Sequence, residues 1–257
     1  MMKRSILLNV FVVVLVLVLS GCVSVGNKLD RKTKLKLADQ RTQSAIAYYL
    51  AGNKKSAYQD IQQALSLNPN HSMANTYMGI MQWFTFKNYG EAEKYFRRAL
   101  SSDRKNAVAQ NNLGSLLCER GKIREAVRMF DQVSNNSLYG NRHYASENAG
   151  ACLMRKPDYK AAEPYFRKAL SANPNMRKSL YFMAKIMYET RHLVPARGFI
   201  LRYMQLIKTK AGPDSLLLAV RIESASGNRN AAASFAFKLK NRYPNSPAAQ
   251  ELKRLRY

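Results

Sequence analysis

The chain has 257 residues, of which 42 are Lys or Arg and 16 are Asp or Glu, so its formal net charge at pH 7 is +26. The basic residues are spread along the whole chain, which excludes a polybasic tail as the source of this charge. A chain of this length can form one sizeable core, or a solenoid in which each repeat contacts only its neighbours.

The first residues have the features of an export signal. Lys3 and Arg4 precede an apolar run over residues 6–19. This run is shorter than the roughly 20 residues of a membrane-spanning helix and fits the apolar part of a signal peptide. Residues 19–22 read LSGC and resemble the lipobox of bacterial lipoproteins. The resemblance implies that residues 1–21 are removed and that Cys22 is lipidated. An uncleaved anchor or an ordinary secretory signal is the alternative.

Lipidation at Cys22 would hold the chain permanently on a membrane, because several acyl chains bury many methylene groups. The next residue is Val23 rather than Asp, which favours the outer membrane. We therefore expect a lipid-anchored protein on the outer membrane that faces the periplasm.

The charge of the exported chain limits its partners. Nucleic acid would explain a basic chain but is rarely met by an exported lipoprotein, so no nucleic-acid partner is expected. Anionic lipid head groups, cell-wall polymers and acidic proteins are better candidates. A generally basic protein composition of the host is the other explanation.

Residues 22–37 are polar and basic and are predicted to form a lipidated, flexible tether. Apolar residues then recur every three or four positions, which predicts helices up to about residue 250. Residues 251–257 are predicted to be a basic C-terminal tail.

An internal repeat organises residues 38–250. Each unit has a small residue, an Ala twelve positions later and a third residue seven beyond. One inserted residue is needed in the second unit, near Asn88–Gly90. The six units contain Ala45, Ala57 and Ala64; Gly79, Ala92 and Ala99; Gly114, Ala126 and Val133; Gly150, Ala162 and Ala169; Ala184, Ala196 and Tyr203; and Val220, Ala232 and Leu239.

This spacing is typical of two antiparallel helices that cross where a small residue lets their backbones approach. Bulky residues of the second helix, such as Phe96 and Phe130, are expected beside the crossing. Gly fits the turn between the helices, and Pro ends the second helix. The pattern predicts an all-α, right-handed superhelix of about six tetratricopeptide (TPR) repeats. An irregular helical bundle is the alternative. Two prolines, Pro164 and Pro195, are expected in the first turns of their helices.

No residues form a recognisable catalytic or metal-binding pattern. His71, His143 and His192 have no second ligand at a metal-binding spacing, and nucleotide-binding and hydrolase motifs are absent from the sequence. The acidic residues 91, 93, 119 and 125 are expected on solvated helix faces or turns. We therefore expect no enzymatic activity, no cofactor, no metal and no small-molecule substrate.

The first helices of TPR repeats line a concave groove, and this predicts the partner-binding residues. Repeats one and two offer an apolar, aromatic set, and repeat five places tyrosines between lysines. Aromatic side chains are strong anchors at interfaces. Packing of these aromatics against the neighbouring repeat, above all for Trp83, is the alternative. The predicted groove residues are Ile46, Tyr49, Met73, Ile80, Trp83, Phe84, Tyr181, Lys185 and Tyr188.

Asn112 and Asn148 occupy equivalent positions, two residues before the small residue of repeats three and four. An amide at this place can bind the backbone of a peptide in the groove. A hydrogen bond between neighbouring repeats is the alternative role. Cys118 and Cys152 remain as an even pair in an oxidising compartment and are candidates for a disulfide.

Three segments of the sequence indicate a particular family of TPR proteins. Residues 111–127 read NNLGSLLCERGKIREAV, residues 147–152 read ENAGAC, and residues 243–247 read YPNSP. Together with the lipobox, they resemble the PilW/PilF family of type IV pilus biogenesis lipoproteins.

The resemblance implies a pilotin, a protein that binds the secretin subunit of the pilus pore and promotes its localisation and assembly in the outer membrane. It also implies a bridge between Cys118 and Cys152. We expect the chain to act as a monomer. A TPR lipoprotein scaffold for outer-membrane protein assembly or for cell-wall enzyme complexes is the alternative function.

Overall fold

The structure is a computed structural model that describes residues 29–254; the predicted leader, Cys22 and residues 23–28 of the predicted tether lie outside this range. The described residues form helices and no strands. The helices are α2 (Arg31–Leu50), α3 (Lys54–Leu67), α4 (Ser72–Phe84), α5 (Tyr89–Ser102), α6 (Ala107–Glu119), α7 (Ile123–Ser134), α8 (Arg142–Leu153), α9 (Tyr159–Ala172), α10 (Arg177–Glu189), α11 (Leu193–Ile207), the 3-10 helix η1 (Lys208–Lys210), α12 (Pro213–Ala225), α13 (Arg229–Arg242) and α14 (Pro247–Arg254).

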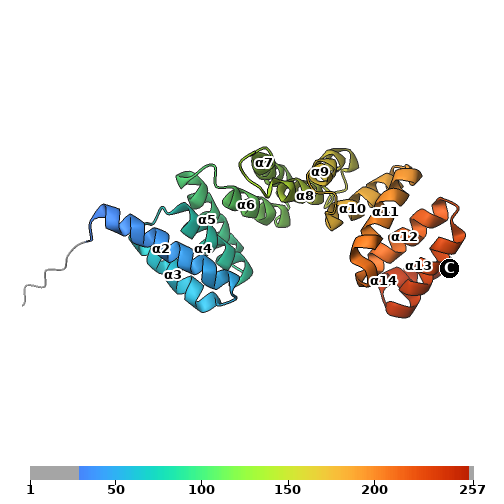
Figure 1. Cartoon of the computed structure of the whole chain (residues 1–257), viewed down its shortest axis with the longest axis horizontal. Coiled ribbons are helices and arrows are strands. Elements are labelled where there is room, and N and C mark those ends of the chain that lie inside the picture. The colour runs from blue at the N-terminus through green and yellow to red at the C-terminus, as the bar shows by residue number, and fades with distance from the viewer. Residues whose placement is uncertain (1–28, 255–257) are drawn as a thin grey trace, which may run out of the picture.

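Helices α2 to α13 form six consecutive pairs, one for each predicted repeat, and follow one another along an arc (Figure 1). The first helix of each pair contacts the first helix of the next, from α2 with α4 through to α10 with α12. The backbones of the second helices, α3 to α13, do not approach one another as closely in the described part of the chain, although side chains such as Arg97 and Glu125 connect them. The first helices therefore lie on the inner side of the arc, and the predicted six-repeat solenoid is confirmed.

Both ends of the solenoid contain more helix than predicted. Helix α2 begins at Arg31, because the Asp30 side chain caps it by accepting a 2.9 Å hydrogen bond from the Thr33 N–H. The assignment of residues 31–37 to a flexible tether is therefore wrong. At the other end, the predicted tail is helical as far as residue 254. Helix α14 packs on α12 and α13 and buries Leu252 fully, so it closes the end of the core.

The small residue of the middle repeats lies against an aromatic ring of its partner helix. A Cβ atom added to Gly114 would lie 2.8 Å from Phe130 Cε1, and one added to Gly150 would lie 2.8 Å from Phe166 Cζ. Gly79 has the same relationship with Phe96, at 2.7 Å. These glycines were expected where two helix backbones approach each other closely. The space is instead filled by the ring, which lies directly over the glycine rather than beside it.

The turns between paired helices follow one scheme in repeats one, three, five and six, whereas repeats two and four depart from it. Gly52, Gly121 and Gly227 have φ near +80°, as their positions predicted, and Arg191 takes the same place in repeat five with φ +66°. The turn of repeat two is one residue longer, which confirms the predicted insertion. It comprises residues 85–88, slightly earlier than predicted, and it leaves the Phe86 side chain half exposed.

The two prolines differ from each other. Pro195 is the third residue of α11 and needs no intrahelical donor, as predicted. Pro164 is the sixth residue of α9, beyond its first turn. The prediction for Pro164 is therefore wrong, and the carbonyl of Lys160 lacks its usual helical N–H partner.

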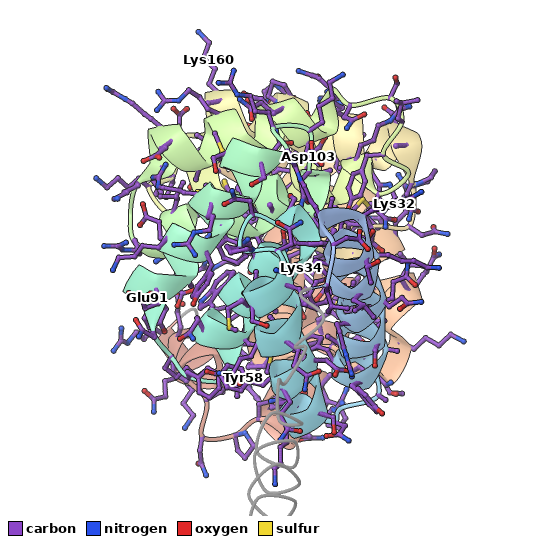
Figure 2. The ribbon with its side chains drawn as sticks, turned by 90° about the vertical axis from the view of Figure 1, so that its left-hand side faces the viewer. Lys32, Lys34, Tyr58, Glu91, Asp103 and Lys160 are labelled. Atoms are coloured by element: carbon purple, nitrogen blue, oxygen red, sulfur yellow. A yellow bond between two sulfur atoms is a disulfide. The ribbon has the colours of Figure 1, made fainter. Side chains whose placement is uncertain are left out.

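Positive charge surrounds the molecule. Seen along the arc from the α2 end, side chains tipped with nitrogen point outward around the outline, with Lys160 among them at the top (Figure 2). None of the helices within residues 29–254 is both long enough and apolar enough to span a membrane.

Candidate functional site on the concave face

The predicted groove residues of repeats one and two differ greatly in accessibility. Ile46, Tyr49 and Met73 are partly exposed, whereas Ile80 is buried. Phe84 is the most accessible member, with 47% of its surface exposed. The side chains that a partner can reach in these repeats are therefore fewer than the sequence pattern indicated.

Trp83 belongs mainly to the core. Only 7% of its surface is exposed, and it packs in one cluster with Leu113 and Leu117 of the next repeat. Its indole N–H donates a 3.1 Å hydrogen bond to the Glu119 carboxylate, and its ring stacks on Phe84 at 4.3 Å. Trp83 therefore packs against the neighbouring repeat, which is the alternative role foreseen for it.

A cavity of about 470 Å³ lies on the inner side of repeats two to five. Glu119, Arg155 and Lys178 give it charged groups of both signs. The first helices α4, α6, α8 and α10 supply most of its lining, which comprises Trp83, Ser115, Cys118, Glu119, Phe130, Asn148, Ala151, Cys152, Arg155, Lys178 and Phe182.

Several of these lining residues were not among the predicted ones, although the pattern could have identified them. Ser115, Cys118 and Ala151 occupy the same positions of repeats three and four that Ile80, Trp83 and Ile46 occupy in repeats one and two. Applying one register to every repeat would have named them. Glu119 and Arg155 follow the last predicted inward position and carry no comparable signal.

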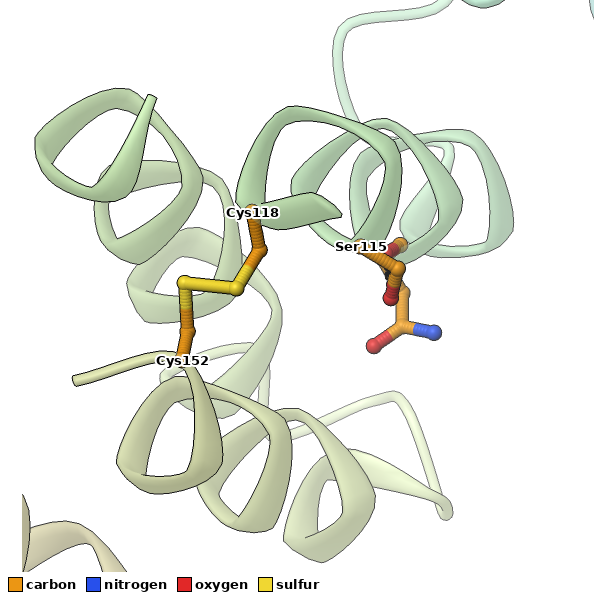
Figure 3. Close-up of a disulfide and its surroundings, with 4 residues drawn as sticks. Ser115, Cys118 and Cys152 are labelled. Carbon is orange, nitrogen blue, oxygen red and sulfur yellow. Dashed lines mark hydrogen bonds between the residues drawn. A yellow bond between two sulfur atoms is a disulfide. The ribbon is translucent and has the colours of Figure 1, made fainter. Parts of the chain in front are cut away.

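The cysteine pair forms part of this lining (Figure 3). The sulfur atoms of Cys118 and Cys152 lie 2.15 Å apart, and their Cα atoms are separated by 5.8 Å. Both cysteines lie on first helices, α6 and α8, which are in contact. Ser115 lies one turn before Cys118 on the same helix and borders the same cavity.

The equivalent asparagines have different partners. The Asn148 amide donates a 3.2 Å hydrogen bond to the side-chain oxygen of Asn111, so it links repeats three and four. The Asn112 amide donates to the Val108 carbonyl of its own helix at 2.8 Å. Asn148, which also lines the cavity, therefore has the inter-repeat role that was foreseen as an alternative, whereas Asn112 does not.

The predicted set of repeat five is partly exposed. Tyr181, Lys185 and Tyr188 each retain some accessible surface. Burial, followed by the nearby Asp214 carboxylate, raises the pKa of Tyr181, and its ring lies 5.6 Å from that of Tyr203. Tyr181 and Tyr188 pack on the core of repeats four to six. They form a half-covered aromatic edge rather than an open groove.

Two buried carboxylates, those of Glu147 and Glu223, connect neighbouring helices. Glu147 is buried and accepts hydrogen bonds from the Ser179 N–H at 2.9 Å and from the Ser179 hydroxyl at 2.7 Å. It thereby caps α10, which has no capping side chain of its own. Glu223 is fully buried and paired with Arg197 at 2.9 Å.

Glu93 is not on a solvated face, contrary to expectation. Its side chain is 14% exposed and pairs with Arg97 at 2.7 Å, with Lys122 at 3.6 Å and with Arg120. Burial alone would raise the pKa of Glu93, but the hydrogen bond from Arg97 and the three cationic charges outweigh it and lower the pKa below its ordinary value of 4.5. This cluster joins repeats two and three.

Two of the three histidines have hydrogen-bonding partners, and the ring of the third, His143, lies against Tyr144. His71 accepts a 3.2 Å hydrogen bond from the Ala74 N–H, which caps α4, and its other ring nitrogen lies 2.7 Å from Asp39. His192 lies 3.0 Å from the Thr190 hydroxyl. No three His, Cys, Asp or Glu side chains within residues 29–254 come together as a metal site.

Comparison with known proteins places this architecture in a family. Two sequence profiles of the tetratricopeptide repeat match residues 84–137 and 111–177. The type IV pilus assembly protein PilF of Pseudomonas aeruginosa is 31% identical over 238 residues, which cover 91% of this chain and 92% of that protein.

Solved structures agree with this relationship. The Pseudomonas aeruginosa PilF structure has a TM-score of 0.78 at 30% identity and covers 86% of this chain and 98% of its own. The structure of PilW, described as a widely conserved type IV pilus biogenesis factor, has a TM-score of 0.71 at 26% identity and covers 84% and 98%. With its six repeats and its near-complete match to PilF, the chain belongs to the PilF/PilW family of tetratricopeptide proteins of type IV pilus biogenesis.

Proposed function

We propose that this chain is an outer-membrane lipoprotein that acts as a pilotin. It binds the secretin subunit of the type IV pilus and promotes the localisation and assembly of the secretin ring in the outer membrane. The observation that carries the proposal is the relationship to PilF over 91% of the chain. The lipobox ending at Cys22 supports the anchor, because lipidation there would keep the solenoid on the membrane in which the ring forms.

The concave face is the surface that we propose for the secretin segment. Ile46, Tyr49, Met73 and Phe84 are its accessible apolar and aromatic side chains in repeats one and two. Aromatic anchors contribute strongly to binding when a partner removes them from water. Covering this surface would also shield apolar segments of the secretin monomer before the ring closes.

We also propose that Cys118 and Cys152 are bridged in the periplasm. A Cα separation of 5.8 Å is within the range of native disulfides. The bridge would fix α6 against α8 on the inner side of the arc, and so hold the middle of the concave face in one shape.

The test of the function is the state of the secretin in a strain that lacks this protein. Membranes would be extracted without heating, and the ring separated from the monomer by electrophoresis. Loss of the ring while the monomer persists is the expected result. A normal ring in the outer membrane would refute the pilotin role and point to the scaffold alternative.

The test of the surface needs variants that leave the core intact. Trp83→Ala is unsuitable, because removing a buried Trp costs about 3–5 kcal/mol of stability. Phe84→Ala is suitable, since half of that ring is exposed, and Phe237→Ala is a matched control on α13 at the far end of the arc. Phe84→Ala should reduce co-purification of the secretin while Phe237→Ala does not. Equal co-purification by both variants would exclude Phe84 from the contact.

A further inference from the structure

A second cavity lies on the outer side of the arc, between the second helices of repeats five and six. It has a volume of about 620 Å³ and lies between α11, η1, the start of α12 and α13. This volume is within the range of ligand-binding clefts in proteins. It is separate from the concave face, because its lining comes mainly from second helices and η1. The lining comprises Met204, Lys208, Thr209, Ala211, Leu216, Phe235, Lys238 and Arg242.

The chemistry of this cleft is divided between its floor and its rim. Leu216 and Ala211 are buried at the floor, and Met204 and Phe235 are partly buried beside them. The rim carries three exposed cations, Lys208, Lys238 and Arg242, and the lining contains no carboxylate. Such a cleft is complementary to a group that combines an apolar body with a negative charge.

The cations of the rim lack acidic partners. Lys238 lies over the Phe235 ring at 5.4 Å, and Arg242 donates a hydrogen bond to the Thr209 carbonyl. Neither of these cations, nor Lys208, forms an ion pair with any described residue. Their charge is therefore available to an external anion.

A cavity at the comparable place between repeats two and three carries less unpaired positive charge. It is lined by two arginines: Glu93 and Glu125 neutralise Arg97 at 2.7 Å and 2.6 Å, and only Arg104 forms no ion pair with a described residue. In repeats five and six, residues 174–254 contain 15 Lys or Arg and 4 Asp or Glu. Two of those four acids, Glu223 and Glu251, are already paired with Arg197 and Arg221.

The backbone at Lys208 is a further sign that the cation is placed there for a purpose other than stability. Lys208 ends α11 with φ +49° and ψ −116°, in the region that favours glycine. Glycine would adopt this conformation without the strain that a Cβ atom causes. A lysine at this position therefore maintains a charge at the rim at the expense of local stability.

We propose that this cleft binds a short segment of a partner protein in which a carboxylate lies beside a large apolar side chain. The apolar side chain would lie on Leu216 and Phe235, and the carboxylate would be bound by Lys208 and Lys238. The carboxylate belongs either to an Asp or Glu side chain or to the end of a chain, which share the same chemistry. The cleft is at the opposite end of the arc from α2, the first described helix (Figure 1), which favours a protein segment over the head groups of the anchoring membrane.

This inference goes beyond the proposed secretin contact, and it is tested without the secretin. The mature chain, residues 22–257, would be titrated into fluorescein-labelled hexapeptides at physiological salt, and binding followed by fluorescence anisotropy. One peptide alternates Glu with Phe and has an amidated end. In the second peptide Ala replaces Phe, and in the third Gln replaces Glu. The fourth peptide has the sequence of the third but ends in a free carboxylate instead of an amide.

We expect the first peptide to bind, and the alanine peptide and the amidated glutamine peptide to bind at least tenfold more weakly. If the fourth peptide binds as tightly as the first, a terminal carboxylate alone can supply the negative charge that the cleft binds. The protein variant Lys208→Gly with Lys238→Gln should weaken the first peptide at least tenfold. The matched control, Lys210→Gln with Lys240→Gln, removes the same charge outside the cleft and should change the affinity less than twofold.

Three results would overturn the proposal. The first is an equal loss of affinity in both double variants, which would mean that the peptide is attracted to a basic surface in general. The second is equal affinity for the Phe and Ala peptides, which would show that the apolar floor does not contribute to binding. The third is failure of every peptide to bind while vesicles containing phosphatidylglycerol bind the wild type and not the cleft variant, which would identify a lipid surface instead. Lys208→Gln, which retains a long side chain, replaces Lys208→Gly if circular dichroism detects a loss of helix.

Discussion

The ring of Phe130 occupies the space that a Cβ atom on Gly114 would need, with only 2.8 Å between that atom and Phe130 Cε1. The pair has counterparts in every repeat, sixteen or seventeen residues apart. Gly pairs with Phe in repeats two to four, and the remaining pairs share core clusters as Ala45 with Ile61, Ala184 with Ile200, and Val220 with Ala236. A larger residue on the first helix therefore accompanies a smaller one on the second, so that the volume at the crossing is balanced.

The first prediction follows from this balance. Gly114→Ala should lower the free energy of unfolding by about 1–3 kcal/mol, since the ring must move in a packed core. Adding Phe130→Leu to this variant should raise its free energy of unfolding again by at least about 1 kcal/mol, because the methyl group introduced at position 114 and the Phe130 ring compete for the same space. Urea denaturation followed by circular dichroism measures both.

Gly198→Ala is the control for this substitution. Nothing lies within 4 Å of the position of its Cβ atom, and it is exposed in α11, so alanine there should stabilise the helix by about 0.5–1 kcal/mol. A double variant of Gly114 and Phe130 whose loss equals the sum of the two single losses would show that the pair is not coupled.

The second prediction concerns Cys118 and Cys152. If they are bridged, the unreduced mature protein should contain no thiol that reacts with a thiol reagent under denaturing conditions. Replacing both with Ser should cost about 3–4 kcal/mol in the chain-entropy description, since the closed loop spans 34 residues. Reductant should lower the midpoint of urea denaturation of the wild type and leave the double variant unchanged. Two reactive thiols in the untreated protein would exclude the bridge.

The third prediction concerns pH. The pKa of Glu93 is lowered in the folded state, so the ionised side chain contributes stability that is present above the ordinary value of 4.5 and is lost as the pH falls through the lowered value. Glu93→Gln should cost about 1–2 kcal/mol at pH 7, because it leaves Arg97, Arg120 and Lys122 without their shared carboxylate.

The difference between wild type and Glu93→Gln should therefore shrink below pH 4.5. Denaturation midpoints of both proteins between pH 7 and pH 3 measure this difference. A constant difference over that interval would mean that the charge of Glu93 does not contribute to stability.

The fourth prediction separates stability from binding at one residue. Lys208→Gly should raise the free energy of unfolding by about 1 kcal/mol, because glycine adopts a positive φ without the strain that the Cβ atom of lysine causes. The same change at Lys210, which ends the same 3-10 helix without a positive φ, should not stabilise the protein. A lower melting temperature for Lys208→Gly than for the wild type would show that the backbone at Lys208 is not strained.

The periodic features of the sequence predicted the fold well. The spacing of Gly and Ala identified all six helix pairs, and the extra residue of repeat two was visible as a gap of thirteen instead of twelve. The ends were misassigned because they lie outside the repeat. Arg31–Leu37 is too polar to be recognised as a core helix, yet the Asp30 cap starts it. Helix α14 is short, and only its contacts with α12 and α13 explain why Leu252 is buried.

The candidate site was predicted less well, because accessibility depends on neighbouring repeats that periodicity does not describe. Trp83 has the inward register of a groove residue, but Leu113, Leu117 and Glu119 of the next repeat cover it. The role of Glu147 in capping α10 joins residues 32 positions apart and has no local signal. Patterns of one helix therefore gave the direction of a side chain, while its exposure had to come from the structure.

The contacts between first helices have a mechanical consequence. The backbones of second helices lie farther apart than those of first helices, and side-chain bonds such as Arg97 with Glu125 and Tyr165 with Asp131 connect them. Neighbouring repeats would therefore tilt by making or breaking these outer bonds, with the inner side as the pivot. A disulfide between Cys118 and Cys152 would lie at that pivot and would hold α6 firmly against α8. The arc would then behave as two flexible arms joined at a stiff centre. Movement of either end would change little of the surface that a partner bound to the middle repeats contacts.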